Sequence, residues 1–335
     1  MRHSCHSREG PIDLSPRTPK TASLTVCAPA RLHLGFLDLN GSLGRRFGSI
    51  GLAIDQPQTR LVIQTAPHHS AHGPESGRAL HLLGRFANHS GRAYSVTIAQ
   101  AIPAHAGLGS GTQLALAIGA AVARLEGRPL TPYGLAQLGE RGARSGIGLA
   151  AFVEGGFLVD GGRGARDVAP PVTLRADFPE HWRVLLILDP RHAGVSGEAE
   201  ALAFKALPAF PEELAAHICR LVLMKLVPGL KELDLKIFGS ALTEIQQILG
   251  DHFAKAQGGS PWTSPAVGRL VKRMGKMGAT GLGQSSWGPT GFAFVDGPEA
   301  AERLYHSLVQ EAKADGLEIV IARGRNAGAT IHPAS

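Results

Sequence analysis

The stretch Ile102-Pro-Ala-His-Ala-Gly-Leu-Gly-Ser-Gly-Thr112 decides the fold of this chain. Its glycines let successive backbone N–H groups turn toward one point, and the apolar run Gly109–Leu125 behind them predicts a helix buried on most sides. A helix N-terminus behind such a loop carries partial positive charge and suits a phosphate or pyrophosphate. Taken alone, the loop fits an ordinary N-cap after a tight turn equally well.

The elements around this loop predict an α+β chain in two lobes. Short β-rich runs precede the loop and indicate an antiparallel sheet, at residues 24–28, 52–54, 61–64 and 94–98. Strands are expected after it at 155–160, 182–189, 290–296 and 317–322, and helices at 132–144, 198–204, 211–227, 235–249, 265–277 and 298–315. The Pro-rich stretch 165–178 lacks periodicity and marks the lobe boundary. We therefore expect a flexible tail over 1–21, an N-terminal phosphate-binding domain over 22–170 and a C-terminal domain over 171–333.

Composition favours a cytoplasmic enzyme that handles small molecules. The 335 residues are 44% hydrophobic and 18% charged, no apolar run approaches the length of a membrane span, and the first 21 residues lack the apolar centre of a secretory signal. Three scattered cysteines argue against a disulfide framework. The net charge of +7 comes mostly from dispersed arginines with few aromatics, which disfavours a nucleic-acid surface and is compatible with a pocket for a polyanionic small molecule.

Three motifs share their order and spacing with one enzyme family. They are Pro29-Ala-Arg-Leu-His-Leu-Gly35, the loop Pro103–Thr112 and Gly283-Gln-Ser-Ser-Trp-Gly-Pro-Thr-Gly291. In these the chain resembles the GHMP small-molecule kinases. The resemblance implies an N-terminal lobe with a left-handed β-α-β crossover, a ferredoxin-like C-terminal lobe and a phosphate site between them. The phosphate-binding residues that it indicates are Gly107, Leu108, Gly109, Ser110, Gly111, Thr112, Ser285, Ser286 and Trp287.

A glycine replaces the catalytic acid of those kinases. Where they have a Ser-Gly-Ile-Asp type of stretch, this chain reads Ser145-Gly-Ile-Gly148. Glycine cannot accept a proton from an attacking hydroxyl or hold a metal ion, so phosphoryl transfer by the usual route of the family loses its base. An ATP-dependent kinase for a sugar or isoprenoid alcohol is an alternative function, against which Gly148 counts. A non-catalytic ligand-binding member of the fold is a further alternative.

A narrower resemblance accounts for the difference. The segments Arg31–Arg45, Phe47–Gly51, Arg144–Gly148 and Gly155–Gly162 are similar to the beta-ribofuranosylaminobenzene 5'-phosphate synthases of tetrahydromethanopterin biosynthesis, a pathway of one-carbon metabolism, and the likeness runs over residues 25–332. It implies condensation of 4-aminobenzoate, or its hydroxy analogue, with phosphoribosyl pyrophosphate, with loss of CO2 and pyrophosphate. It also implies no organic cofactor and a homodimer.

This chemistry assigns roles to two charged residues that the resemblance also marks. Loss of pyrophosphate leaves an oxocarbenium-like centre, so the site must neutralise the departing phosphates and stabilise a cation. The guanidinium of Arg45 can grip phosphate oxygens in a fork. The carboxylate of Asp38 can face the sugar cation or hold a Mg²⁺ that bridges the pyrophosphate. We expect Mg²⁺ to be the one inorganic cofactor.

Other candidate residues have both a functional and a structural interpretation. Arg31 and His33 are placed to contact a phosphate, although a buried histidine is as often structural. Arg144, with Arg141, forms either an anion clamp or a solvated helix face. Trp287 either stacks on the aromatic substrate or fills the core.

Two further features have predominantly structural interpretations. Lys225, in an apolar stretch, either reaches the site or extends to solvent. The dense group His68, His69 and His72 lies in a Ser/Gly/Pro-rich stretch and is predicted to be loop rather than a zinc site.

Overall fold

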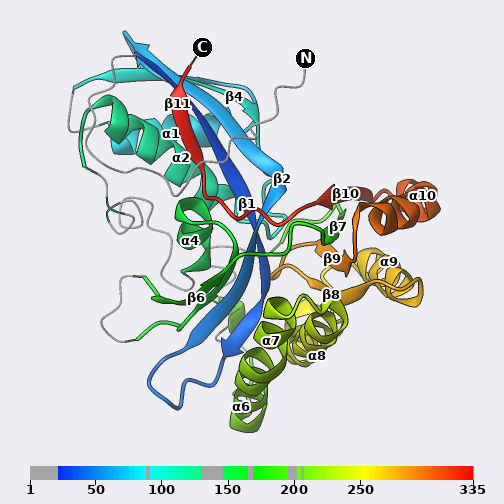
Figure 1. Ribbon diagram of the computed structural model, residues 1–335. Coiled ribbons are helices and arrows are strands. Elements are labelled where there is room, and N and C mark those ends of the chain that lie inside the picture. Colours follow the sequence, from blue (N-terminus) through cyan, green and yellow to red (C-terminus); the bar gives the residue numbers. More distant parts are fainter. Residues whose placement is uncertain are drawn as a thin grey trace.

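The computed structural model describes residues 22–87, 91–129, 131, 134, 146–164, 169–194, 202–204 and 207–334. The expected tail, the expected helix at 132–144 with Arg141 and Arg144, and most of the expected helix at 198–204 lie outside these residues. In the described part, two antiparallel-rich sheets with helices against them form two lobes joined by a shared core (Figure 1). This confirms the predicted two-lobed α+β fold.

A long two-stranded ribbon, β1 with β2, is the spine of the first lobe (Figure 1). The sheet order is β11-β1-β2-β4-β3, and β5 pairs with both β2 and β6. The strands are β1 (Ser23–Asp38), β2 (Phe47–Ala66), β3 (Ser70–His72), β4 (Ala93–Gln100), β5 (Phe157–Asp160), β6 (Val172–Ala176) and β11 (Thr330–Pro333). The first motif, which lies beyond the strand expected at 24–28, is part of one continuous β1 strand with register shifts at Pro29/Ala30 and His33/Gly35.

Two helices of the first lobe share one apolar core with its sheet. The helix α2 (Ser110–Leu125) buries 12 of its 16 residues, which confirms the prediction of a helix enclosed on most sides. It packs with α1 (Ser76–Phe86) against strand residues such as Val26 and Ile63. The sequence did not predict α1 or the short helix α4 (Ile147–Val153).

The second lobe is a four-stranded antiparallel sheet of order β10-β7-β9-β8. Its strands are β7 (Arg183–Leu188), β8 (Thr280–Gln284), β9 (Thr290–Val295) and β10 (Glu318–Ala322). Its main helices are α6 (Glu212–Leu221), α7 (Val227–Lys231), α8 (Leu235–Phe253), α9 (Pro265–Lys276) and α10 (Pro298–Ala314), with a π-helical turn at Val222–Leu226 and a 3-10 turn at Ala254–Gln257. Asp234 and Ser264 start α8 and α9 by accepting hydrogen bonds from the backbone N–H groups of Ile237 and Val267.

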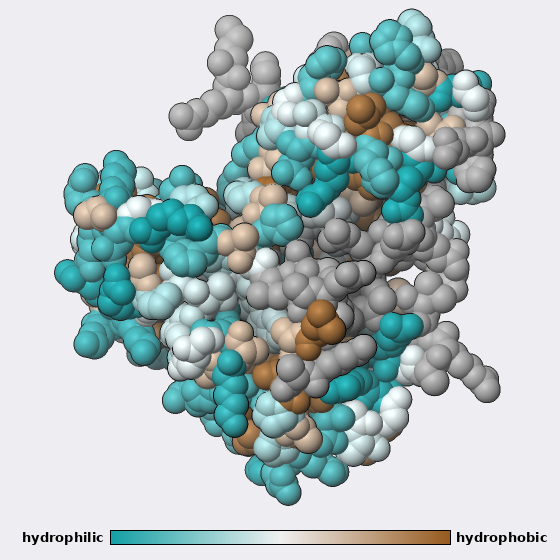
Figure 2. All heavy atoms as spheres, turned by 180° about the vertical axis from the view of Figure 1, so that it is seen from behind, coloured by the Kyte–Doolittle hydropathy of each residue, from teal (hydrophilic) through white to brown (hydrophobic). Residues whose placement is uncertain are grey.

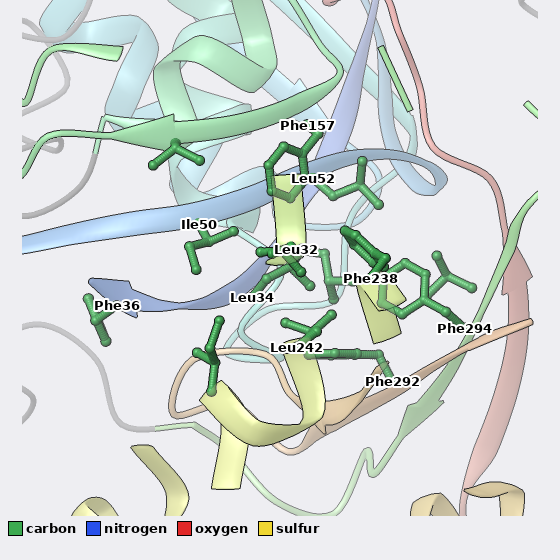
Figure 3. Packing of buried hydrophobic residues seen from close by; sticks show 14 of the residues in the cluster. Leu32, Leu34, Phe36, Ile50, Leu52, Phe157, Phe238, Leu242, Phe292 and Phe294 are labelled. Carbon is green, nitrogen blue, oxygen red and sulfur yellow. The ribbon is translucent and has the colours of Figure 1, made fainter. Parts of the chain in front are cut away.

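The two-residue period of β7 assigns its faces to two different cores. Leu185 and Ile187 pack in a cluster with residues of α9 and α10. Leu186 belongs instead to the cluster that joins the lobes, which includes Leu32 and Phe238 and is shown in part in Figure 3. Because other side chains cover both faces of the sheet, the residues of β7 after Arg183 are all apolar.

Strand pairing places two segments differently from the expected domain boundaries. The strand β6, beyond the expected boundary at 170, pairs with β5 in the first sheet. The C-terminal strand β11 returns to pair with β1. Because β6 and β11 belong to the first sheet, the first lobe extends past residue 170 and also includes the C-terminal strand.

The surface that Figure 2 shows is largely hydrophilic, with apolar side chains scattered over both lobes. Among the described residues, the helices include none with the length and hydrophobicity needed to span a membrane.

Candidate active site

The glycine loop is held against β1 in a conformation that depends on glycine. Gly107 and Gly109 have φ angles of 81° and 79°, in the left-handed region that side-chain-bearing residues rarely adopt. Gly109 is the N-cap of α2. The backbone N–H of Arg31 donates to the carbonyl of Leu108 at 3.0 Å, and the Leu108 side chain is fully buried. The first two motifs are thus fixed to each other.

Ser285 joins the third motif to the first two. Its Oγ accepts a hydrogen bond from the backbone N–H of His33 at 3.0 Å and donates to the carbonyl of Gly107 at 2.8 Å. A Cβ at position 107 would overlap the carbonyl oxygen of Ser285, so the loop and the 285–288 turn can approach only because Gly107 lacks a side chain. The three motifs therefore meet at one place, which we call the cradle: residues 107–112, Arg31, His33 and 285–287.

Arg31 brings positive charge to the cradle. Its Nη1 donates to the carbonyl of Gly107 at 3.4 Å, and its side chain lies beside Gly109, where a Cβ would be 3.6 Å from the Cβ of Arg31. Ser110, Gly111 and Thr112 form the first turn of α2 and are half-buried. A guanidinium and a helix N-terminus on the same side of one loop suit an anion.

His33 is a neutral group in the wall of the cradle. Its side chain is 3% exposed and its ring packs on Phe36 with centroids 4.5 Å apart. Burial, with a smaller contribution from the Arg31 charge, lowers the pKa of His33 well below its usual value, so the imidazole is uncharged near pH 7. Within the described part of the chain, its Nε2 has no hydrogen-bond partner.

Position 148 faces the cradle. Gly148 lies in the first turn of α4, its carbonyl accepts a hydrogen bond from Gln113 Nε2 at 2.8 Å, and a Cβ there would be 3.4 Å from Thr112 Cγ2. A side chain at 148 would therefore be directed at the start of α2. Glycine leaves that position without an acid.

Asp160 is a buried carboxylate that the sequence did not single out. It is fully buried at the end of β5 and accepts hydrogen bonds from the backbone N–H groups of Ser49, Gly146 and Gly162 at 2.8–3.1 Å. These contacts tie β2 and the start of α4 to β5. A carboxylate held by three backbone donors has a structural role and does not replace the missing acid at 148.

Trp287 is part of an aromatic cluster rather than an open platform. Its ring is 3% exposed, lies stacked on Phe204 at 4.7 Å and meets Phe253 edge-on at 5.1 Å. These contacts favour the core interpretation of this residue. They also place two further aromatic rings, unpredicted from sequence, next to the cradle.

Asp38 and Arg45 lie apart from the cradle, at the far end of the β1–β2 ribbon. At about 3.3 Å per residue, the five residues from His33 to Asp38 span roughly 16 Å. Asp38 Oδ1 accepts hydrogen bonds from the N–H groups of Asn40 and Gly41, which closes the turn. Arg45 donates from Nε and Nη2 to the carbonyls of Gly161 and Gly162, both at 2.7 Å. The two residues share one loop region but have no described contact with the cradle.

A resident Mg²⁺ site is not built by the described residues alone. They contain no cluster of three or more His, Cys, Asp or Glu side chains that could hold a metal ion. A single carboxylate with one oxygen already engaged could hold only a Mg²⁺ that keeps most of its waters.

Asp189 is a second buried carboxylate that the sequence analysis missed, and its backbone contacts the third motif at Pro289. It is 2% exposed and accepts hydrogen bonds from Arg191, His192 and Ser264, while its backbone N–H donates to the carbonyl of Pro289. Burial alone would raise the pKa of Asp189, but the hydrogen bonds from Arg191 and Ser264 hold the pKa well below its usual range. The folded state therefore favours the charged carboxylate.

We expect Asp189→Asn to change the pH dependence of stability. A depressed folded pKa stabilises the wild type above the unfolded pKa near 4, and this contribution is lost as the pH falls below it. The variant should have a free energy of unfolding lower by about 3 kcal/mol at pH 7, and the gap should narrow by pH 3. Urea unfolding at both pH values measures this difference in the free energy of unfolding between wild type and variant. An equal difference at pH 3 and pH 7 would contradict the lowered pKa of Asp189.

The remaining candidate residues, Lys225 and the histidine group, lie in or next to helical or strand segments outside the cradle. Lys225 lies half-buried in the π-helical turn. The expected loop at His72 is in fact β3, which pairs with β4, because the parallel register Ser70↔Ser95 continues to His72. His69 Nδ1 accepts a hydrogen bond from the Tyr94 backbone N–H, so this histidine group packs on the sheet edge.

Comparison with known proteins first defines the class. The family model for the GHMP kinases N terminal domain matches residues 77–156, and that for the GHMP kinases C terminal matches residues 226–314. The crystal structure of a homoserine kinase from Cytophaga hutchinsonii shares the fold, with a TM-score of 0.67 over 94% of this chain and 99% of that one at 18% identity. The fold is that of the GHMP kinase superfamily.

Sequence relatives then define the family. A beta-ribofuranosylphenol 5'-phosphate synthase from Methanothermobacter thermautotrophicus is 32% identical over 91% of this chain and 98% of its own length. One of the same name from Archaeoglobus fulgidus is 34% identical over 92% of this chain and 99% of its own length. This chain belongs to the beta-ribofuranosylphenol 5'-phosphate synthase family. The relatives are named for a phenol, where the sequence resemblance put the aminobenzene first and the hydroxy analogue second.

Proposed function

We propose that this chain joins 4-hydroxybenzoate or 4-aminobenzoate to phosphoribosyl pyrophosphate for the biosynthesis of tetrahydromethanopterin. The observation that carries the proposal is the glycine at 148. The position faces the first turn of α2, so the chain keeps an anion cradle but has no acid there to activate an alcohol. An enzyme with this arrangement can hold a leaving group without transferring a phosphoryl group.

The proposed reaction balances without an added oxidant or reductant. The bond between the anomeric carbon and the pyrophosphate oxygen breaks, and pyrophosphate leaves with the electron pair. The ring carbon bearing the carboxylate attacks the anomeric carbon, and the new carbon–carbon bond forms. The bond between the ring and the carboxylate carbon then breaks, CO2 leaves, and the electron pair of the broken bond restores the aromaticity of the ring. The para hydroxyl or amino group donates electrons to the ring, so no organic cofactor is needed.

The chain contributes electrostatics and positioning to these steps. The N–H groups at the start of α2 and the guanidinium of Arg31 would bind the departing pyrophosphate. Arg45 and Asp38, on the β1–β2 turn, would act on a second charged part of the substrate, with Mg²⁺ entering as the pyrophosphate complex. The relatives' names support the phenol as the ring.

The reaction can be tested with labelled substrates. Purified protein with phosphoribosyl pyrophosphate, Mg²⁺ and carboxyl-labelled 4-hydroxybenzoate or 4-aminobenzoate should release labelled CO2 and pyrophosphate in equal amounts. Omitting phosphoribosyl pyrophosphate should abolish release, and added ATP should not be consumed. The ratio of the rates with the two acids assigns the ring substituent.

The kinase alternative gives the opposite result. A kinase would convert ATP to ADP with a sugar or isoprenoid alcohol and release no CO2 from either acid. That outcome would replace the proposed function.

A further inference from the structure

A cavity of about 310 Å³ lies between the lobes, beside the cradle. One wall comes from β1, and the others come from α8, α9, β8 and the segment between α8 and α9. Its apolar lining includes Phe36, Leu249, Phe253 and Trp262. A dry cavity of roughly 150 Å³ already holds benzene, so this one has room for a substituted benzene ring.

The cavity adjoins the phosphate-binding loop. His33 and Ser286 line it, and the backbone of His33 is joined through the Ser285 hydroxyl to the carbonyl of Gly107. A ligand in the cavity and an anion at the loop would therefore both lie next to the same short stretch of β1. A reaction that joins two substrates needs adjacent subsites of this kind.

The exposed side chains of Gln247, Asp251 and Lys272 line the cavity, and two further glutamines in its wall are engaged with neighbouring groups. Gln246 donates to the carbonyl of Leu34 and accepts from the backbone of Gln284. The Gln284 side chain accepts from the backbone N–H of Thr263 and donates to Gln257. His33 differs, since its Nε2 is buried and has no hydrogen-bond partner among the residues that the structure describes. A buried polar atom without a partner costs stability unless a ligand satisfies it.

We propose that this cavity is the subsite for the aromatic acid and that His33 Nε2 hydrogen-bonds its carboxylate end. The inference rests on the proposed function and locates its second substrate. The ring carbon bearing the carboxylate must reach the anomeric carbon, and the sugar is held at the cradle, so this carbon points toward His33. The para substituent then points away from His33.

A neutral histidine suits a carboxylate that must leave. With the proton on Nε2, the imidazole donates one hydrogen bond and fixes the ring. A cation at this position would bind the carboxylate more strongly and would raise the barrier to losing CO2. His33 is kept uncharged by burial and by Arg31, as described above.

Filling the cavity tests its assignment. Gly250 of α8 and Pro261 both line it, and a Cβ at position 250 would be 3.1 Å from Pro261 Cβ, so a larger side chain there must take up space in the cavity or displace its wall. Gly250→Leu should therefore raise the KM for the aromatic acid at least tenfold and leave the KM for phosphoribosyl pyrophosphate within twofold. The matched control is Gly84→Leu in α1, where a Cβ meets nothing within 4 Å, and it should behave as wild type.

A second variant tests the histidine while keeping an aromatic ring in its place. His33→Phe keeps an aromatic ring against Phe36 and removes Nε2. Isothermal titration calorimetry with 4-hydroxybenzoate and 4-aminobenzoate should give a dissociation constant at least tenfold weaker than wild type for the acid that the enzyme uses. Thermal unfolding establishes that each variant is folded before its affinity is compared.

The outcomes separate this inference from the proposed function. If wild type releases CO2 but folded Gly250→Leu and His33→Phe both bind the acid as wild type does, the cavity is not the aromatic subsite and the function stands. If wild type releases no CO2, the proposed function fails. Should calorimetry also detect no binding of either acid to wild type, the cavity assignment fails with it.

Discussion

Replacing Gly107 with alanine is expected to reduce synthase activity more than 100-fold. The residue has a φ of 81°, and a Cβ at this position would overlap the Ser285 carbonyl and lie 3.0 Å from Gly288 Cα. The loop must move away from the third motif, and a displacement of about 1 Å in a positioning element can cost about 100-fold in rate. The hydrogen bond from Ser285 Oγ to the Gly107 carbonyl would be lost with it.

Gly91→Ala is the matched control for this substitution. Gly91 has a φ of 65°, and a Cβ there meets nothing within 4 Å. Gly91→Ala has only the cost of placing alanine in a left-handed conformation, about 1 kcal/mol. Gly107→Ala has this cost and also the steric clash with Ser285. Activity at saturating substrate and the free energy of unfolding should be measured for both variants. Wild-type turnover in Gly107→Ala would show that the contact of the loop with Ser285 is not needed for catalysis.

The second large effect is expected at the other end of the β1–β2 ribbon. Asp38→Asn should lower kcat/KM by about 100-fold or more, since one preorganised charged or hydrogen-bonding group contributes about that much to transition-state stabilisation. The amide keeps an oxygen to accept from Asn40 and Gly41, so the turn should remain folded. Arg45→Gln should lose a similar factor in activity and about 1–2 kcal/mol of stability, because it also removes the hydrogen bonds to Gly161 and Gly162.

The exposed pair Arg269 and Asp315 supplies matched controls. Its two side chains are joined at 3.0 Å on the surface of the second lobe, and such a pair contributes less than about 1 kcal/mol. Arg269→Gln and Asp315→Asn make the same chemical changes far from the turn and should leave kcat/KM unchanged. Near-normal rates in both Asp38→Asn and Arg45→Gln would restrict the catalytic site to the cradle and the cavity.

Under the proposed function, one fold would serve two chemistries. The glycine backbone angles and the helix N-terminus of the cradle suit an anion, and these features do not depend on which bond breaks. At position 148 the chain has no side chain to face the cradle. In the proposed reaction, a glycine there would exclude phosphoryl transfer by the usual route without disturbing the core.

Local patterns in the sequence predicted the elements that depend on local physics. The apolar run after the glycine loop predicted α2, and the short apolar run at 182–189 predicted β7. These signals depend on residues close together in the sequence, and the structure confirmed both elements. Gly107 and Gly109 of the loop adopt positive φ values. The missing acid at position 148 was also readable directly from the sequence.

Contacts between distant residues were decided only by the tertiary structure. The sequence did not show that β1 continues unbroken through the first motif, that β11 returns from the C-terminus to pair with it, or that Asp160 and Asp189 are buried acceptors. Nor did it separate Asp38 and Arg45 from the cradle or reveal the cavity beside His33. Sequence alone determined which backbone conformations and charges are available. Only packing of the two lobes decided which of them meet, because strand register and inter-lobe contacts depend on residues hundreds of positions apart.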